Sequence, residues 1–336
     1  MAGHVNLRAG RFLVIGRAGM DLYADPPGTR IEEATRFTSC LGGSSANIAV
    51  SLVRQGLAAS LLGCVSDDAV GRFCLAELDR YGVARGHVRA VGGEARNSIA
   101  VVETRLEDCQ SVIFRNGVAD FQMTVEDIDA VDMRPFAGLI TTGTVLASEP
   151  SRSAAFVAFE RAMTLGIPLI FDVDYRPYSW ASAEEAADVY SRAASLCDII
   201  VGNDVEFGFM AGDYVAGLDQ ARALSAEGGR IVVYKRGELG AVTFAAGAEI
   251  ATGVFQVAAL KPTGAGDAFL GGFIAALTRG IGLHDAVLHG SACAAIVVTR
   301  IGCAPAMPTL AELDTFLSNH PAPQRAEGYR YAYRSV

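Results

Sequence analysis

Short apolar segments alternate with stretches of helical character along most of this 336-residue chain, and no other feature constrains its fold as strongly. Four of the segments, 139–141, 169–171, 199–201 and 231–234, are expected to be buried strands, each followed by a helical stretch. Parallel strands need a long crossover between them, usually a helix, so this rhythm is typical of an α/β fold. We therefore expect a mainly parallel sheet between two layers of helices.

The N-terminal part shows the same rhythm until a pair of β-prone segments interrupts it. Strands are expected at 12–15 and 59–65, and helices at 44–55 and 70–81. Segments 98–103 and 110–115 are both β-prone and are separated by a short polar stretch, so they predict a hairpin outside the alternation. The C-terminal part is expected to be helical over 266–299 and again near 309–318.

Composition argues against several kinds of partner. A net charge of −9 leaves no basic stripe with which to neutralise a nucleic acid. The apolar runs are too short for a membrane span, and the start of the chain is a strand candidate, not a signal peptide. Seven cysteines without a C-x-x-C pair indicate reduced thiols, with neither disulfides nor a zinc site. We expect a cytoplasmic protein that binds neither nucleic acid nor membrane.

The sequence Thr263-Gly264-Ala265-Gly266-Asp267 places a small-residue loop and an acid before the apolar helix expected from residue 268. Glycines let backbone N–H groups converge, and the helix N-terminus adds partial positive charge, so the loop suits a phosphate. A carboxylate beside a phosphate has a role if it accepts the proton of an attacking hydroxyl. The loop therefore indicates phosphoryl transfer without a Walker motif, with an ordinary helix cap as the alternative.

A second glycine pair, Gly42 and Gly43, opens the helix expected at 44–55 and places Asn47 near its first turn. Alone, this pair is compatible with a tight turn and a cap. Together, the two loops in this order resemble the two signatures of the PfkB (ribokinase-like) family of sugar and nucleoside kinases.

The resemblance extends from about residue 11 to residue 317. It implies a ribokinase-like three-layer α/β fold, with one kinase domain at 1–320 and a loose C-terminal tail at 321–336. It also implies a small β lid over the sugar, built from segments at about 22–38 and 88–118. Lids of this kind exclude water from the reaction.

The resemblance also implies a role for each residue that matches a family motif. Asp267 matches the catalytic base, and the backbone N–H groups of Gly264, Ala265, Gly266 and Asp267 form the anion hole. Sugar contacts fall on Asp21, Gly42, Gly43 and Asn47, contacts to ATP and Mg²⁺ on Asn203 and Glu206, and nucleotide contacts on Lys235 and Gly237. ATP and Mg²⁺ are the implied cofactors, and no residue is assigned as a direct metal ligand. Ordinary caps and a solvated strand-end lysine are the alternatives.

Residues 172–180 resemble the D-x-N-x-R element of family members that act on hexoses and sugar acids, with Asp174 where asparagine is usual. Arg176, with Arg115 and Arg96 of the lid, offers guanidinium groups for a substrate carboxylate. Salt bridges to nearby acids are the alternative. Strings at 16–25, 92–97, 107–111, 115–117 and 261–267 resemble members that phosphorylate the C6 hydroxyl of a keto-deoxy sugar acid in myo-inositol breakdown. A sugar acid and ATP are the implied partners.

Lys261 precedes the glycine loop where relatives usually carry an aspartate. In ribokinase-like members that aspartate helps to bind an activating monovalent cation. A lysine repels such an ion, so we hypothesise that the ammonium of Lys261 replaces it and that activity is largely independent of potassium. In the alternative, Lys261 points to solvent and the loop needs no cation.

Other interpretations remain open at this stage. A 2-keto-3-deoxygluconokinase or a fructokinase would share the catalytic residues and differ in its pocket. A non-catalytic sugar-binding homologue would show no turnover. A dinucleotide enzyme would need a G-x-G-x-x-G after the first strand, which residues 16–19 do not supply. Apolar lid residues such as Ile113 and Phe114 would allow a homodimer through the lid, but alternation alone does not place them on either face.

Overall fold

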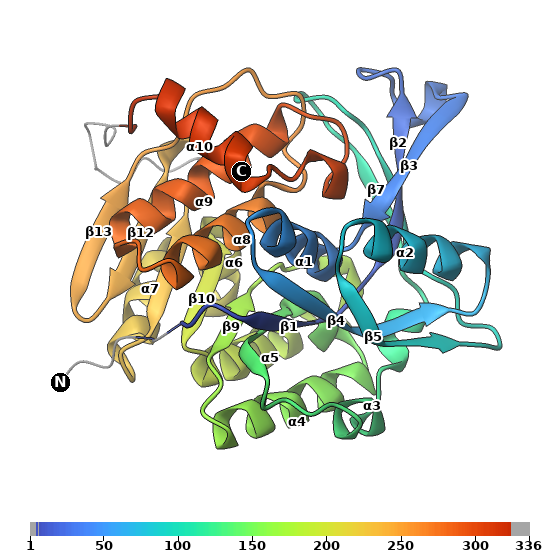
Figure 1. Ribbon diagram of the computed structural model, residues 1–336, viewed down its shortest axis with the longest axis horizontal. Coiled ribbons are helices and arrows are strands. Elements are labelled where there is room, and N and C mark those ends of the chain that lie inside the picture. The colour runs from blue at the N-terminus through green and yellow to red at the C-terminus, as the bar shows by residue number, and fades with distance from the viewer. Residues whose placement is uncertain (1–4, 6, 324–336) are drawn as a thin grey trace.

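The computed structural model describes residues 5 and 7–323, which form a large sheet, a small sheet and the helices around them (Figure 1). The part of the expected tail beyond residue 323 lies outside the described residues. The large sheet has nine strands in the order β13-β12-β11-β10-β9-β8-β1-β4-β5. They are β1 (Arg11–Ile15), β4 (Ala58–Ser66), β5 (Ala84–Val91), β8 (Phe136–Thr142), β9 (Leu169–Asp172), β10 (Ile199–Asn203), β11 (Ile231–Lys235), β12 (Ala241–Ala245) and β13 (Ala248–Thr252).

The strands from β11 to β5 all run parallel to their neighbours, which confirms the mainly parallel sheet. At the other edge, β12 and β13 form an antiparallel hairpin. The expectation that a helix follows the strand at 231–234 is therefore wrong. Ala246 and Gly247 at the hairpin turn have φ of 50° and 78°, the positive values that a tight two-residue turn requires.

Helices cover both faces of the large sheet (Figure 1). The described residues form α1 (Ser44–Arg54), α2 (Ala69–Arg80), α3 (Val125–Asp129), α4 (Ser151–Thr164), α5 (Ala183–Leu196), α6 (Asp204–Ala211), α7 (Gly217–Ala226), α8 (Ala265–Thr278), α9 (Leu283–Val298) and α10 (Leu310–Asn319). Short 3-10 turns occupy η1 (Ile31–Glu33), η2 (Ala119–Gln122), η3 (Gly143–Ala147), η4 (Pro177–Ser179), η5 (Tyr214–Ala216), η6 (Gly237–Leu239) and η7 (Ala304–Ala306). The helical region expected at 266–299 is two helices, α8 and α9, which pack against each other.

The central strand β1 shows how the sheet separates two hydrophobic cores. Phe12 and Val14 pack in the core that includes residues of α1, α2, α8, α9 and α10. Leu13 and Ile15 pack in the core with residues of α3 to α7. Successive side chains of a strand point to opposite faces, so a strand buried on both faces reads as a continuous apolar run. This confirms the three-layer fold.

The small sheet has four strands in the order β3-β2-β6-β7 and stands to one side of the large sheet (Figure 1). Its strands are β2 (Gly19–Asp25), β3 (Arg36–Gly42), β6 (Ile99–Val102) and β7 (Ser111–Phe114). The pair β6–β7 is the hairpin expected at 98–115. The first hairpin extends beyond the expected 22–38 at both ends, and residues 88–91 belong to β5 of the large sheet.

Candidate active site

Several of the residues expected in the site lie close together near the carboxyl ends of the parallel strands. The N-termini of α1 and α8 meet there, because Asn47 of α1 hydrogen-bonds Asp267 of α8. Ser44, one turn earlier in α1, donates its hydroxyl to Asp174 in the loop after β9. Open α/β sheets bind their ligands at this edge.

The glycine loop before α8 has the geometry of an anion site. Gly264 precedes the helix with φ +83°, a conformation that glycine adopts without strain. A Cβ at this position would lie 2.9 Å from the Sγ of Cys303, so a larger residue would require that thiol to move. Ala265, Gly266 and Asp267 form the first turn of α8, whose N–H groups have no acceptor within the helix. These N–H groups and the helix dipole suit a phosphoryl group.

Asp267 is held in that first turn by Asn47, whose Nδ2 donates to Oδ2 of the carboxylate at 2.9 Å. Burial raises the pKa of Asp267 to about 7, and the negative charge of Asp174 adds to the rise. The hydrogen bond from Asn47 and the charges of Arg176 and Lys235 limit it. A carboxyl group with a pKa near neutrality is well matched to removing a proton from a hydroxyl.

Lys235 ends β11 and reaches the N-terminus of α8. Its Nζ lies 3.4 Å from the position that a Cβ on Gly266 would occupy, and 5.7 Å from the centre of the Phe269 ring. The ammonium is therefore beside the same N–H groups that suit a phosphate, as expected for a nucleotide contact. Gly237 lies two residues farther on, exposed at the start of η6, and its φ of 55° lets the chain turn there.

Asn203 and Glu206 form a reciprocal cap at the start of α6. Oδ1 of Asn203 accepts from the Glu206 N–H at 2.9 Å, and Oε2 of Glu206 accepts from the Asn203 N–H at 2.7 Å. Glu206 is buried, and its Oε1 also accepts from the Tyr175 N–H at 3.2 Å. Burial raises the pKa of Glu206, although Lys235 opposes this. Glu206 thus joins the loop after β9 to α6, which a solvated helix acid would not do.

Asp172, at the end of β9, is buried in the site; it begins the D-x-N-x-R element but received no role of its own from the sequence. Burial raises its pKa well above the usual range, and the carboxylates of Asp174 and Glu206 add to the rise while Lys235 lowers it. Carboxylate oxygens of this kind are the ligand type that Mg²⁺ prefers. In the described part of the chain, no three His, Cys, Asp or Glu residues are grouped to hold a metal. A bound Mg²⁺ would share its coordination with phosphate oxygens and water.

Asp21 and the glycine pair lie where the small sheet meets α1. A Cβ on Gly42 would fall 1.9 Å from Oδ1 of Asp21, so the carboxyl group packs directly on this glycine. Gly43 has φ +95°, and a Cβ there would lie 2.5 Å from the Arg17 carbonyl oxygen. Position 43 therefore requires glycine, and a side chain at Gly42 would displace the carboxyl group of Asp21. Burial raises the pKa of Asp21, and Arg17 is the strongest charge opposing this.

Two buried acceptors in this region have no hydrogen-bond partner among the described residues. They are Oδ1 of Asp21 and Oδ1 of Asn47. Unpaired buried acceptors are costly, so groups like these are candidates for a ligand donor. Hydroxyl groups of a sugar supply such donors.

Arg176 and Asp174 form an ion pair at the end of β9, with Nη2 of the arginine 2.7 Å from Oδ1 of the carboxylate. Nη1 of Arg176 donates to the Tyr175 carbonyl at 3.0 Å. Asp174 is buried and has φ 38°, which is uncommon for a residue other than glycine or asparagine. Burial disfavours its charge, but Arg176 and the Ser44 hydroxyl outweigh this and lower its pKa.

Arg115 and Arg96 differ in their surroundings. Arg115 is buried and paired with Asp120, with Nη2 2.5 Å and Nε 3.1 Å from Oδ2, and its guanidinium lies 4.2 Å from the centre of the Phe121 ring. Its Nη1 is buried without a partner. Arg96 is exposed and donates to the carbonyls of Gly93 and Ala95 at 2.9 Å. The positive charges of Arg176 and Arg115 both lower the pKa of Asp174. Arg96 is not among the groups with the largest effect on that pKa.

Lys261 is fully buried, so the alternative in which it points to solvent is wrong. Its Nζ donates to the Thr263 carbonyl at 2.5 Å, directly before Gly264. Burial lowers the pKa of Lys261, and the nearby Cys303, Asp267 and Asp21 oppose this effect. The ammonium is therefore part of the structure that supports the anion loop.

The outer face of the small sheet carries large exposed side chains. Phe114 is 61 % exposed, Val112 46 % and Phe37 41 %. Ile113 points the other way and packs on the small core formed by Tyr23, Cys40, Ala100, Val102 and Cys303. The sequence alone did not determine which of these side chains face outward. In the structure, Phe114 faces outward and Ile113 faces inward.

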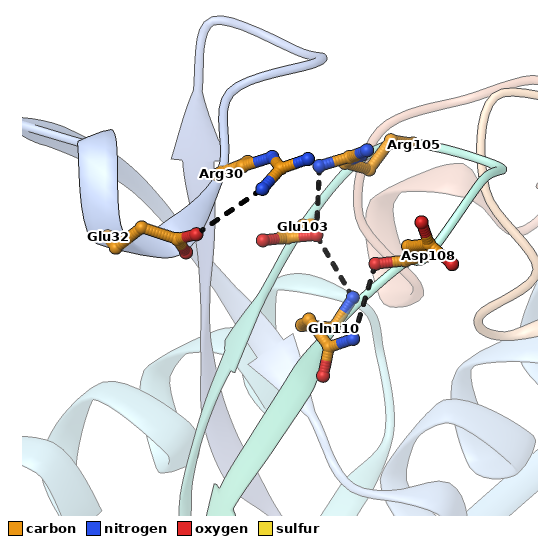
Figure 2. A pocket seen from close by; sticks show the side chains of 6 residues that line it. All are labelled: Arg30, Glu32, Glu103, Arg105, Asp108 and Gln110. Atoms are coloured by element: carbon orange, nitrogen blue, oxygen red, sulfur yellow. Dashed lines mark hydrogen bonds and ion pairs between the residues drawn. The ribbon is translucent and has the colours of Figure 1, made fainter.

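A cavity of about 270 Å³ lies at the far end of the small sheet, between η1 and the β6–β7 hairpin (Figure 2). Its lining is polar and mostly charged: Arg30, Glu32, Glu103, Arg105, Asp108 and Gln110. Glu103 is buried, and its carboxylate accepts from the N–H groups of Ile31 and Gln110, both at 3.0 Å. Glu103 therefore holds the two outer loops of the small sheet together.

The chain is similar to known carbohydrate kinases over most of its length. The model of the pfkB family carbohydrate kinases matches residues 10–310. A 5-dehydro-2-deoxygluconokinase of Photobacterium profundum is 37% identical over 91% of this chain and 94% of its own length. One of Geobacillus kaustophilus is 36% identical over 92% of this chain and 94% of its own. A fructokinase mutant of Vibrio cholerae O395, in a fructose, ADP and potassium ion bound form, superposes with TM-score 0.81 at 27% identity over 93% of this chain and 99% of its own.

The chain belongs to the PfkB family of carbohydrate kinases. It is a phosphotransferase that acts on an alcohol group. No helix in residues 5 and 7–323 is both long enough and apolar enough to cross a membrane.

Proposed function

We propose that this kinase transfers the γ-phosphoryl group of ATP to the C6 hydroxyl of 5-dehydro-2-deoxy-D-gluconate, a step of myo-inositol catabolism. The single observation that carries the chemistry is the Asn47–Asp267 pair at the N-terminus of α8. It places a carboxylate with a pKa of about 7 beside a set of N–H groups that suit a phosphate. The relatives named for this activity cover nearly the whole chain, which supports the choice of substrate.

The residues define the steps of the transfer. The carboxylate of Asp267 accepts the proton of the C6 hydroxyl as its oxygen attacks the γ-phosphorus. The bond from that phosphorus to the β–γ bridging oxygen breaks, and ADP leaves with the electron pair. The N–H groups of Ala265, Gly266 and Asp267, with the ammonium of Lys235, stabilise the charge on the phosphoryl oxygens. Mg²⁺ bound with the nucleotide would neutralise further charge.

Sugar binding falls to the small sheet and α1. Oδ1 of Asp21 and Oδ1 of Asn47 accept hydrogen bonds from sugar hydroxyls, which gives both atoms the partners they lack. The small sheet acts as a lid over the sugar and excludes water. Arg176 and Arg115 contribute positive charge near the sugar, although each already pairs with a carboxylate.

Substrate-dependent release of ADP tests this function. Purified protein with ATP and Mg²⁺ is offered 5-dehydro-2-deoxygluconate, 2-keto-3-deoxygluconate or fructose, with Asp267→Asn as the control for contaminating kinases. We expect turnover of the first that the variant lacks. No substrate-dependent ADP with any sugar would favour a non-catalytic homologue, and a preference for either other sugar would assign the enzyme to that activity.

We further propose that Lys261 takes the place of a monovalent cation. Its buried ammonium already binds the Thr263 carbonyl, an oxygen of the type that would otherwise ligate such an ion. Rates measured in KCl and in NaCl at equal ionic strength should then be similar. Strong activation by potassium would contradict this role.

The exposed face of the small sheet supports a homodimer through the lid. Phe37, Val112 and Phe114 lie on this face, and β7 is an edge strand with one side free for pairing. Light scattering should give the mass of a dimer for the wild type and of a monomer for Phe114→Glu. Leu165→Glu is the control, because Leu165 is 46 % exposed at the end of α4. A monomeric wild type would rule out this assembly.

The compartment that we propose is the cytoplasm. All seven cysteines are unpaired, as expected in a reducing compartment where ATP is available. Fractionation of cells that express the natural gene checks this, since recovery with the membranes or outside the cell would contradict it.

A further inference from the structure

Arg17 has an unusual environment that the proposed chemistry does not use. It lies between β1 and β2, and it is 7 % exposed. Its Nη1 donates to the hydroxyl of Ser98 at 3.0 Å, while its Nε is buried without a partner. Among the described residues, no carboxylate lies within ion-pair distance of its guanidinium group. Its charge acts on the nearby buried Asp21, but a buried guanidinium without a directly bonded carboxylate is costly, so its retention calls for a role.

The two other arginines near Arg17 are already paired. Arg17, Arg115 and Arg176 all act electrostatically on Asp174 and on Tyr178. Arg176 is paired with Asp174, and Arg115 with Asp120. Of these three arginines, Arg17 is therefore the one without an ion pair among the described residues. Arg115 keeps one spare donor, its buried Nη1.

The position of Arg17 relative to the reacting groups follows from α1. The Arg17 carbonyl accepts from the Ala46 N–H at 3.2 Å, so Arg17 lies against the first turn of that helix. Ser44 contacts Asp174 at one end of the turn, and Asn47 contacts Asp267 at the other. Three residues of α-helix rise about 4.5 Å. A short extended molecule along this turn can therefore present one end to Asp267 and the other to the arginines.

We propose that Arg17 binds the substrate carboxylate and makes the enzyme select for an acid over a neutral sugar, with Nη1 of Arg115 as a second donor. The inference deepens the proposed function and depends on it for the nature of the substrate. Guanidinium groups bind carboxylates through strong charge-assisted hydrogen bonds. A neutral sugar leaves Arg17 buried and unpaired, which disfavours that sugar beyond the loss of one contact.

The test compares the acid with its primary amide, which has the same shape and no charge. The values of kcat/KM for both are measured for the wild type, Arg17→Met and Arg17→Lys. Arg161→Met is the matched control, because Arg161 is half-buried on α4 and bonds to Ile128 and Asp129 away from the site. We expect Arg17→Met to lower kcat/KM for the acid roughly 10- to 100-fold, mainly through KM, and to leave kcat/KM for the amide unchanged or raised, because the buried unpaired charge is gone.

Arg17→Lys keeps the charge but loses the planar donor arrangement, so it should fall between the wild type and Arg17→Met. Arg17→Lys also provides the comparison of acid and amide if Arg17→Met fails to fold. Equal losses on acid and amide would overturn the inference while leaving the proposed function intact. A wild type that does not turn over the acid would instead refute the proposed function, and the inference with it. Arg161→Met should leave the acid-to-amide ratio unchanged.

Discussion

The two sheets of this protein differ in how fully they are covered. In the large sheet, β9 is buried along its whole length, and β1 at every residue except its first. In the small sheet, β7 has no fully buried residue, and β3 is buried only at its last three residues, where it meets α1. The large sheet therefore holds the phosphoryl-transfer groups in a rigid setting. In the small sheet, the buried residues gather around the sugar site and the small core on its inner face, and its outer face is left exposed to bind another surface.

Asp267→Asn tests the phosphoryl-transfer groups that the large sheet holds, and it should have the largest effect of these substitutions. The variant keeps the size of the side chain but removes the group that accepts the hydroxyl proton, so kcat should fall roughly 10²- to 10⁴-fold. The measurement is steady-state ADP release at saturating ATP and sugar. A kcat within a few-fold of the wild type would remove Asp267 from its role as base.

Phe171→Ala should destabilise the protein far more than Phe114→Ala. Phe171 of β9 is fully buried, and its ring centre lies 5.9 Å from that of Tyr190, so its loss leaves a cavity that costs about 3–5 kcal/mol in the free energy of unfolding. Phe114 of β7 is 61 % exposed, and the same substitution should cost less than about 0.5 kcal/mol. Urea unfolding measures both. Similar costs would contradict the difference between the sheets.

Gly42→Ala tests the contact between the buried end of β3 and the carboxyl group of Asp21. The new Cβ would lie 1.9 Å from Oδ1 of Asp21, so the carboxyl group must move, at a cost of about 1–3 kcal/mol in stability and with a raised KM for the sugar. Gly86→Ala in β5 is the matched control, since a Cβ there meets nothing within 4 Å. The KM for ATP should change little. If both variants behave alike, Asp21 is not held by Gly42.

The effect of Asp267 on stability should depend on pH. Because the folded-state pKa of about 7 lies above that of the unfolded chain, the native state binds the proton more tightly, and this stabilisation is lost as the pH rises through about 7. Asp267→Asn cannot lose a proton there. Its unfolding free energy should exceed that of the wild type by about 1–2 kcal/mol at pH 8, and the gap should shrink towards pH 5. A gap independent of pH would show that Asp267 has an ordinary pKa.

The parallel strands were predictable because each is a continuous apolar run. The β12–β13 hairpin was not, because Ala245 at the end of β12 and the turn residues Ala246 and Gly247 have low β propensity and resemble a loop. Nothing in the sequence indicates that Ala246 adopts a positive φ.

The candidate site was only partly predictable. The glycine positions follow from backbone geometry, and Asn203 with Glu206 has the spacing of a capping box. The burial of Glu206 depends on Tyr175, about thirty residues earlier in the chain. Arg17 and Asp172, the latter within the D-x-N-x-R element, were given no role of their own because a charged residue at a strand end is usually solvated, and only the tertiary packing shows that these two are buried.

The most direct test of the central claim is the ratio of kcat/KM for 5-dehydro-2-deoxygluconate to that for its primary amide in the wild-type enzyme, with the phosphorylated carbon located by phosphorus-31 NMR. We predict a strong preference for the acid and a phosphate on C6, because a carboxylate bound by arginine leaves the far hydroxyl at Asp267. An equal or higher kcat/KM for the amide, or phosphate on another carbon, would contradict it.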